Sequence, residues 1–151
     1  MLRAAKAALK GAKKAPMLLG VTVLTSLDEG ELIRIGLTGP LAGRVVALAR
    51  TAKVAGMDGI VTAGNHIQAV RQALGRKMTI VVPGIRPGSP GDAKNVAPRD
   101  DQAQVATPGN AIRWGADYLV VGRPITAAPD PVAATDAILQ EMELAHRNRN
   151  K

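Results

Sequence analysis

The stretch GADYLVVGRPITAAPDPVAA, residues 115–134, contains the strand, the turn and the start of the helix of one unit of the fold. Its apolar run Tyr118–Val121 predicts a short strand, and Gly115 before it predicts the end of a helix. Gly122-Arg123-Pro124 is expected as a turn after the strand. Asp130-Pro131 then pairs an N-cap residue with proline at the first helical position, which predicts a helix over 131–145. A strand followed by a helix is the repeating unit of parallel α/β sheets.

The same alternation precedes this unit. Further strands are predicted over 17–24, 59–62 and 78–82, and further helices over 2–12, 27–36, 41–55, 65–74 and 107–114. Ser26, with Glu29 three residues later, is the predicted N-cap of the helix over 27–36, and Thr107-Pro108 opens the helix over 107–114. One leading helix and four strand–helix pairs predict an α/β fold with a parallel sheet.

The composition is that of one domain, residues 1–151, with a core free of large aromatic side chains. Apolar residues make up 46% of the chain, but it contains no Phe, one Trp and one Tyr. We therefore expect a core of Ala, Val, Leu and Ile. The sequence contains no Cys, which excludes disulfides, thiolate metal sites and a Cys nucleophile. The apolar run 17–24 is too short to cross a bilayer, so no membrane partner is expected.

The net charge of +8 is concentrated at the two ends of the chain. Residues 1–14 carry five Lys or Arg and no acid, residues 146–151 carry three, and the body between them is neutral. We expect a basic outer helix at the start and a frayed basic tail at the end. Because the excess charge lies in these separate ends, nucleic acid is not an expected partner.

Three interpretations of the leading segment stay open. Arg3, Lys6, Lys10 and Lys13 share one face of the predicted helix, with Leu2, Ala5, Leu9 and Ala12 opposite. This pattern is typical of a solvated outer helix, of a basic targeting presequence, or of a surface for nucleic acid or anionic membranes. The segment has no Ser, which counts against the presequence, and no aromatic residue that could stack on bases.

Candidate site residues follow the predicted strands, because sites of parallel α/β sheets form at the carboxyl ends of strands. Arg86 and Arg123 lie there in glycine-containing turns, which favours binding of an anion such as phosphate, although each turn is also compatible with a solvated arginine. The aperiodic segment 83–106 is long enough to be functional. His66 is expected at the surface or capping a helix. With two histidines and no His/Glu cluster, no metal site is expected.

Four stretches together resemble the second half of bacterial orotidine 5′-phosphate decarboxylases. They are LLGVTVLTSLDEGEL (18–32), VVPGIRPG (81–88), DDQAQVATPGNAI (100–112) and the stretch 115–134. The resemblance covers residues 1–145 in order. It implies a (β/α)8 TIM barrel, a homodimer, a cytoplasmic location, and conversion of orotidine monophosphate to UMP without a cofactor.

The resemblance also implies substrate-binding roles for individual residues. Thr25 matches a residue that contacts the nucleotide, and Arg86 matches the arginine of the GIRP turn. Gly122 and Arg123 match the residues that bind the phosphate after the last strand. Gln102 matches the glutamine that closes over the phosphate and pyrimidine. An alternative register places Ala93 at that position, but the Gln102 register agrees with Val105–Pro108 downstream.

The catalytic Lys/Asp array of that family, with the form DxKxxD, occurs nowhere in this sequence. The resemblance therefore implies a half barrel of four βα units behind a leading outer helix, with no catalytic residue in the chain and no activity alone. Such a half is expected to associate with a complementary half barrel or with a copy of itself. The alternatives are an inactive module that binds phosphorylated nucleotides and a structural assembly subunit.

Overall fold

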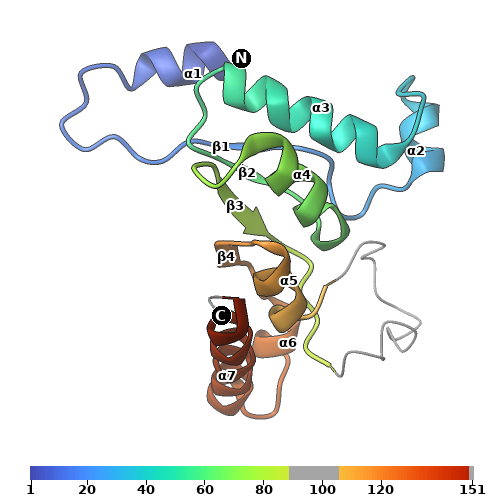
Figure 1. Cartoon of the computed structure of the whole chain (residues 1–151), viewed down its shortest axis with the longest axis vertical. Coiled ribbons are helices and arrows are strands. Elements are labelled where there is room, and N and C mark those ends of the chain that lie inside the picture. Colours follow the sequence, from blue (N-terminus) through green and yellow to red (C-terminus); the bar gives the residue numbers. More distant parts are fainter. Residues whose placement is uncertain (89–105, 150–151) are drawn as a thin grey trace.

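The computed structural model describes residues 1–88 and 106–149. Four strands form one parallel sheet in the order β1-β2-β3-β4 (Figure 1). They are β1 (Leu19–Val21), β2 (Gly59–Val61), β3 (Thr79–Val82) and β4 (Tyr118–Leu119). The register aligns Val21 with Val61, Val61 with Val81, and Val81 with Tyr118. The predicted α/β class and parallel sheet are confirmed.

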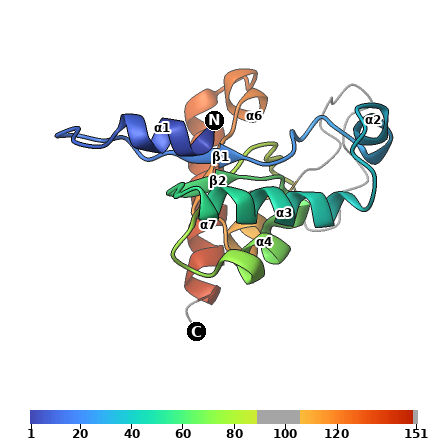
Figure 2. The ribbon, with the colours of Figure 1, turned by 90° about the horizontal axis from the view of Figure 1, so that it is seen from above.

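Helices occupy the segments between the strands. They are α1 (Leu2–Ala8), α2 (Glu29–Arg34), α3 (Leu41–Val54), α4 (Ile67–Leu74), α5 (Pro108–Trp114), α6 (Arg123–Thr126) and α7 (Pro131–Arg149), with a 3-10 turn η1 (Gly64–His66) before α4. Helices α3 and α4 lie on the same side of β1 and β2 (Figure 2). Helix α3 packs on α4, α4 on α5, and α5 on α7.

The two faces of the sheet differ in exposure. Gly20 faces α3 so closely that a Cβ at this position would lie 2.8 Å from the Cβ of Ala52. Ile60 and Ile80, aligned with Gly20, are fully buried. On the opposite face, Leu19, Val21 and Tyr118 are 38%, 57% and 60% exposed. The core consists of Ala, Val, Leu and Ile as predicted, with the addition of Met57 and Met78.

Two helix-to-strand junctions share one construction that the sequence analysis missed. In GMDG (56–59) and GADY (115–118), a glycine with positive φ follows the helix, with φ of 82° at Gly56 and 108° at Gly115. The next N–H then reaches back five residues to a helix carbonyl in both junctions. The Asp that follows stands directly before a strand in both.

The first of these carboxylates, Asp58, joins three segments. Its Oδ2 accepts a hydrogen bond from the N–H of Leu18 at 2.8 Å, and its Oδ1 accepts one from Lys6 Nζ at 2.7 Å. The hydrogen bonds from Leu18 and then from Lys6 lower the pKa of Asp58. Lys6 is half-buried in this ion pair, whereas Arg3 and Lys10 on the same helix are exposed.

The second carboxylate, Asp117, repeats this arrangement beside β3. Its Oδ2 accepts a hydrogen bond from the N–H of Ile80 at 2.8 Å and another from Arg71 Nη2 at 2.7 Å. In each case a strand-leading Asp fixes the start of the neighbouring strand, and a cation from a helix compensates its charge. The device therefore sets the register of the strands at their amino ends.

The predicted N-cap Ser26 is wrong, because a better cap lies two residues later. The carboxylate of Asp28 accepts from the N–H of Glu31 at 2.8 Å, and the Glu31 carboxylate accepts from the N–H of Asp28 at 3.0 Å. This reciprocal capping box satisfies two backbone donors, so α2 begins at Glu29.

Other predicted boundaries differ at the ends of elements. Helix α1 ends at Ala8 and not near residue 12; beyond it Gly11 has φ of 89°, outside the helical region. Strand β1 is limited to the three residues that pair with β2, and β4 to two residues. The predicted frayed tail is wrong for residues 146–149, because α7 continues through them.

Candidate functional site

The predicted site residues within the described chain lie at the carboxyl edge of the sheet. Thr25 follows β1, Arg86 follows β3, and Gly122 and Arg123 follow β4. Because the strands are parallel and in register, the segments that leave their carboxyl ends share one edge (Figure 1). Gln102 and its alternative, Ala93, lie outside the described residues.

Thr25 lies in the turn that carries the chain away from β1. The side chain of Thr22 donates a hydrogen bond to the carbonyl of Val61 at 2.9 Å and extends the link to β2 beyond the strand. The N–H of Leu27 then donates to the carbonyl of Leu24 at 3.1 Å and closes a turn around Thr25, which is half-buried. This position is compatible with the predicted contact to a nucleotide.

Arg86 belongs to a turn that is fixed at both ends. Gly84 has φ of 72°, a conformation that favours glycine, and directs the chain away from β3. Ile85 then forms a parallel bridge with Ala106, and the N–H of Arg86 donates to the carbonyl of Ala106 at 3.0 Å. The Arg86 side chain is half-buried, and its Nη1 donates to the carbonyl of Ile85 at 3.0 Å.

Gly64 brings the loop after β2 against this same bridge. A Cβ at Gly64 would collide with the Cβ of Ala106 and would lie 3.2 Å from its backbone nitrogen. Only glycine permits this approach without a shift of the chain. This role of Gly64 was not predicted, although a glycine in a short loop directly after a strand is a usable signal for close backbone contact.

Gly122 and Arg123 do not form the turn that was predicted. They begin the short helix α6, in which the Gly122 carbonyl accepts from the N–H groups of Ile125 at 2.9 Å and Thr126 at 3.0 Å. Pro124 has a φ preset for the first turn of a helix, which explains why the segment is helical. Arg123 and Gly122 are exposed, and no atom lies within 4 Å of the position of a Cβ on Gly122.

The start of α5 is held beside this edge by two caps. Thr107 Oγ1 accepts from the N–H of Asn110 at 3.2 Å, which confirms the predicted N-cap. Glu141 of α7 accepts from the N–H of Gly109 at 2.8 Å. These bonds fix the point at which the chain re-enters the described structure after residue 105.

His66 is buried, so the prediction of a surface position is wrong. It is 7% exposed and occupies the N-cap position of α4, but its side chain forms no capping hydrogen bond. The extra 3-10 turn Gly64–His66 draws this segment inward against Ala106. Across residues 1–88 and 106–149, no group of three or more His, Asp or Glu residues could hold a metal ion. No helix in that part of the chain is long and apolar enough to span a membrane.

The parallel sheet with its loops gathered at the carboxyl edge defines the class: the chain has the fold of the TIM, or (β/α)8, barrel proteins, with four parallel strands present here. It belongs to the Orotidine 5′-phosphate decarboxylase / HUMPS family, whose family model matches residues 1–138.

Individual relatives show the same similarity. The chain is 47% identical over 142 residues to an orotidine 5′-phosphate decarboxylase of Nitrosococcus oceani, and the match covers 94% of this chain and 58% of the relative. It is 50% identical over 133 residues to one of Anaeromyxobacter dehalogenans, covering 88% and 56%. The crystal structure of the Lactobacillus acidophilus enzyme superimposes with a TM-score of 0.72 at 34% identity, covering 94% and 58%. The chain thus spans less than two thirds of the length of each of these relatives.

Proposed function

We propose that this chain is the carboxyl-terminal, phosphate- and nucleotide-binding half of an orotidine 5′-phosphate decarboxylase, which converts orotidine monophosphate to UMP. The observation that carries the proposal is the placement of Arg86 and Arg123. Both arginines belong to glycine-containing segments that leave the neighbouring strands β3 and β4 at one edge of the sheet. Two guanidinium groups at one edge suit a phosphate, since each binds two oxygens in a planar arrangement.

Gly122 and Arg123 take the main part in phosphate binding. The open space at the missing Cβ of Gly122 lets a phosphate oxygen approach the backbone, where the amide donates a hydrogen bond. Arg123 pairs with the remaining oxygens. Thr25 contacts the nucleotide from the β1 side, and Gln102 closes over the phosphate and pyrimidine.

The reacting groups are not supplied by this chain. Decarboxylation without a cofactor requires a cation to protonate the carbanion and fixed carboxylates that orient it, and the sequence contains no DxKxxD array. We propose that the isolated chain is inactive, and that a complementary half barrel or a second copy covers the exposed sheet face of Leu19, Val21 and Tyr118. The family resemblance adds a cytoplasmic location and the absence of a cofactor to this proposal.

The missing array also favours a second candidate function. A chain that keeps the phosphate-binding edge without the reacting groups is suited to bind phosphorylated nucleotides without turnover, or to serve only as a structural half barrel. Binding and turnover therefore have to be measured separately.

Calorimetric titration with UMP tests the binding half of the proposal. We expect saturable binding that Arg123→Ala weakens at least about tenfold, because a charge-assisted bidentate contact is lost. Arg76→Ala is the matched control, since Arg76 is an exposed arginine at the opposite edge. Absence of UMP binding by the folded chain would overturn both the enzyme and the nucleotide-binding module.

A decarboxylase assay tests the assignment of turnover. We expect no activity from the chain alone and activity after mixing with the amino-terminal half of a relative's barrel. Turnover by the chain alone would contradict the proposed absence of reacting groups. UMP binding with no activity in either assay would favour the inactive module.

A further inference from the structure

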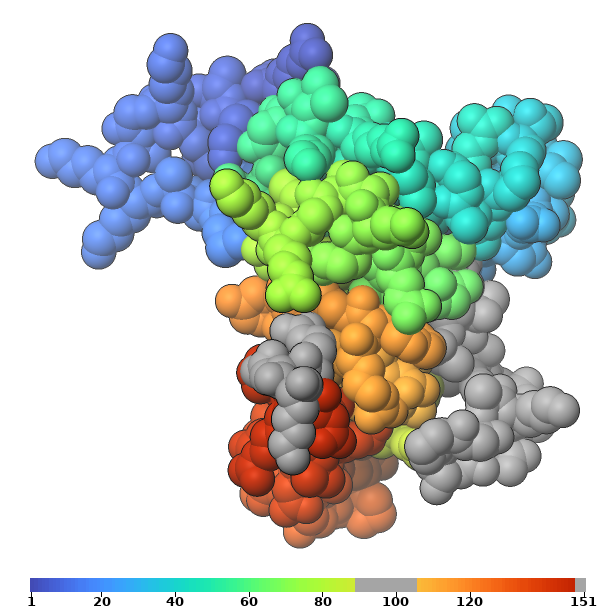
Figure 3. Space-filling view, viewed as in Figure 1, coloured from blue at the N-terminus to red at the C-terminus, as the bar shows by residue number. Residues whose placement is uncertain are grey.

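The amino edge of the sheet, opposite the candidate site, gathers exposed cations from segments far apart in sequence. The loop before β1, the end of α3 and the loop before β3 all lie where the strands begin, on the left of Figure 1. We name their exposed basic residues the amino-edge cluster: Lys10, Lys13, Lys14, Lys53, Arg76 and Lys77. The space-filling view places the leading segment and the turn before β3 on the same side of the molecule (Figure 3).

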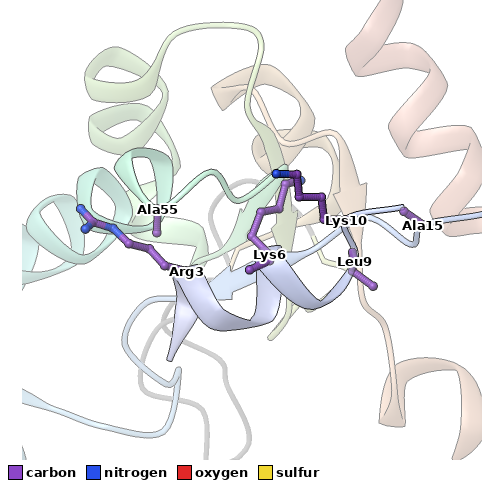
Figure 4. A pocket seen from close by; sticks show the side chains of 7 residues that line it. Arg3, Lys6, Leu9, Lys10, Ala15 and Ala55 are labelled. Atoms are coloured by element: carbon purple, nitrogen blue, oxygen red, sulfur yellow. The ribbon is translucent and has the colours of Figure 1, made fainter. Parts of the chain in front are cut away.

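Acidic residues at this edge do not neutralise the cluster. Asp58 and Asp117 stand at the starts of β2 and β4, but each is paired at 2.7 Å, with Lys6 and Arg71 respectively. The close-up view shows that Arg3, Lys6 and Lys10 all line one cavity of about 420 Å³, with Lys6 and Lys10 side by side and Arg3 pointing in another direction (Figure 4). Lys10 therefore adds a positive charge beside an ion pair that is already complete.

Acidic residues stand at the starts of α2 and α7, on the carboxyl side of the sheet. Asp28, Glu29 and Glu31 cap or follow the start of α2, and Asp130 caps α7. At the carboxyl edge these acids stand beside arginines such as Arg34 and Arg123, whereas at the amino edge the exposed cations outnumber the acids.

Helix dipoles do not account for most of the cluster. A helix C-terminus favours cations within its last turn, which explains Lys53 in α3. Lys13 and Lys14 lie well beyond the end of α1, and Arg76 and Lys77 lie beyond the C-cap Gly75 of α4. Within residues 1–88 and 106–149, these four side chains form no hydrogen bond or ion pair that would explain them as structural.

We propose that the amino-edge cluster binds the phosphate backbone of a nucleic acid duplex without reading its sequence. The starts of β1 and β3 are two strand spacings, or about 10 Å, apart, so the basic segments that precede them can contact different phosphates of one duplex, which follow one another at about 3.4 Å along each strand. No aromatic residue stands in 9–18 or 75–78 that could stack on single-stranded bases. Small residues such as Gly11 and Ala12 separate the lysines, where insertion into a membrane would require large apolar ones.

This proposal reverses the expectation from sequence that nucleic acid is not a partner. That expectation treated the leading basic segment as isolated from a neutral body. The fold brings the segment to the same edge as Arg76 and Lys77, which belong to that body. The proposal is independent of the function of the carboxyl edge, because Arg86 and Arg123 lie at the other ends of the strands.

Fluorescence anisotropy with the full chain and a labelled duplex of mixed sequence, about 20 base pairs long, tests the proposal. Contacts to about five phosphates predict that affinity falls on the order of 10²- to 10³-fold between 50 and 200 mM NaCl. Two double variants, Lys13→Gln/Lys14→Gln and Arg76→Gln/Lys77→Gln, are each expected to weaken binding about tenfold or more and to reduce the salt slope by about two. All four positions lie outside helices and strands, so folding is retained.

Arg34→Gln/Arg44→Gln is the matched control, because it removes the same net charge from the end of α2 and the start of α3, away from the amino edge, and should leave the salt slope unchanged. Excess UMP is also expected to leave duplex binding unchanged. Equal weakening by all three double variants would overturn the proposal in favour of a general charge effect. Binding to phosphatidylserine vesicles without binding to the duplex, or no duplex binding at 50 mM NaCl, would also overturn it.

Discussion

Asp58 and Asp117 occupy equivalent places at two helix-to-strand junctions, yet their cationic partners differ in how they are held. Lys6 reaches Asp58 from the leading helix through one hydrogen bond, and its side chain is 40% exposed. Arg71 reaches Asp117 from α4, and its side chain is 17% exposed. The two Asp residues thus make equivalent bonds, but Asp58 is paired with a cation at the surface and Asp117 with a mostly buried one. The two junctions should therefore respond differently to mutation.

Arg71→Ala should have the largest effect. Beyond its bond to Asp117, the guanidinium donates to the carbonyls of Gly75, Met78 and Gly115. The Gly115 carbonyl accepts two of these bonds, from Nε and from Nη2. Removing it leaves the part-buried carbonyls of Met78 and Gly115 without this donor and Asp117 without its partner, so we expect a loss of about 3–4 kcal/mol in the free energy of unfolding. Urea titration measures this loss. Arg71→Lys should recover only part of it because lysine lacks the planar fork, and full recovery would contradict the geometric argument.

Asp58→Ala should have an intermediate effect. It removes the acceptor of the Leu18 N–H and leaves Lys6 without its partner. We expect a loss of about 1–2 kcal/mol by the same titration. A loss as large as that of Arg71→Ala would show that the two junctions are equally central to the fold.

Lys6→Met should have a smaller effect than either. Methionine keeps the apolar stem and removes only the charge of a partly exposed ion pair. We expect about 0.5 kcal/mol, because exposed pairs are screened by solvent. A loss above about 1.5 kcal/mol would place the leading helix in the cooperative core.

The pH dependence of stability should show the smallest effect. Because the folded state lowers the pKa of Asp58 from its ordinary value of 3.8, the ionised carboxylate stabilises the fold. This contribution is complete above the ordinary pKa and disappears as the pH falls through the lower pKa of the folded state. Between pH 6 and pH 3, Asp58→Asn should lose less stability than the parent chain. Identical pH profiles would show that the lowered pKa contributes nothing.

Much of the fold could be predicted from sequence, because each strand is a short apolar run with a glycine or a cap beside it. Strand lengths could not be predicted, since pairing with the neighbour ends β1 at Val21 while the apolar run continues. The cap of α2 was assigned to Ser26 because the spacing of a capping box also occurs two residues earlier than the true one at Asp28. Local patterns locate elements, whereas tertiary contacts decide where those elements end.

The candidate site was predicted only as a set of segments. Strand order places Thr25, Arg86 and Arg123 at one edge, but the glycine and proline around Arg123 were taken for a turn where the chain forms the short helix α6. The burial of His66 and the contact of Gly64 with Ala106 could not be predicted, because Ala106 lies about forty positions further along the chain and is brought there only by the fold. The pairing of Lys6 with Asp58 was missed for the same reason.

The bridge that joins Ile85 and Arg86 to Ala106 has a consequence for how the family can vary. It holds the two ends of the intervening segment together through the sheet and the start of α5, independently of what lies between them. In general, a change in the number of residues between two fixed ends of a flexible chain costs about 0.6 kcal/mol of closure entropy for each doubling of the length. The framework around Arg86 and the start of α5 is therefore expected to tolerate a change in the length of the sequence between its two ends.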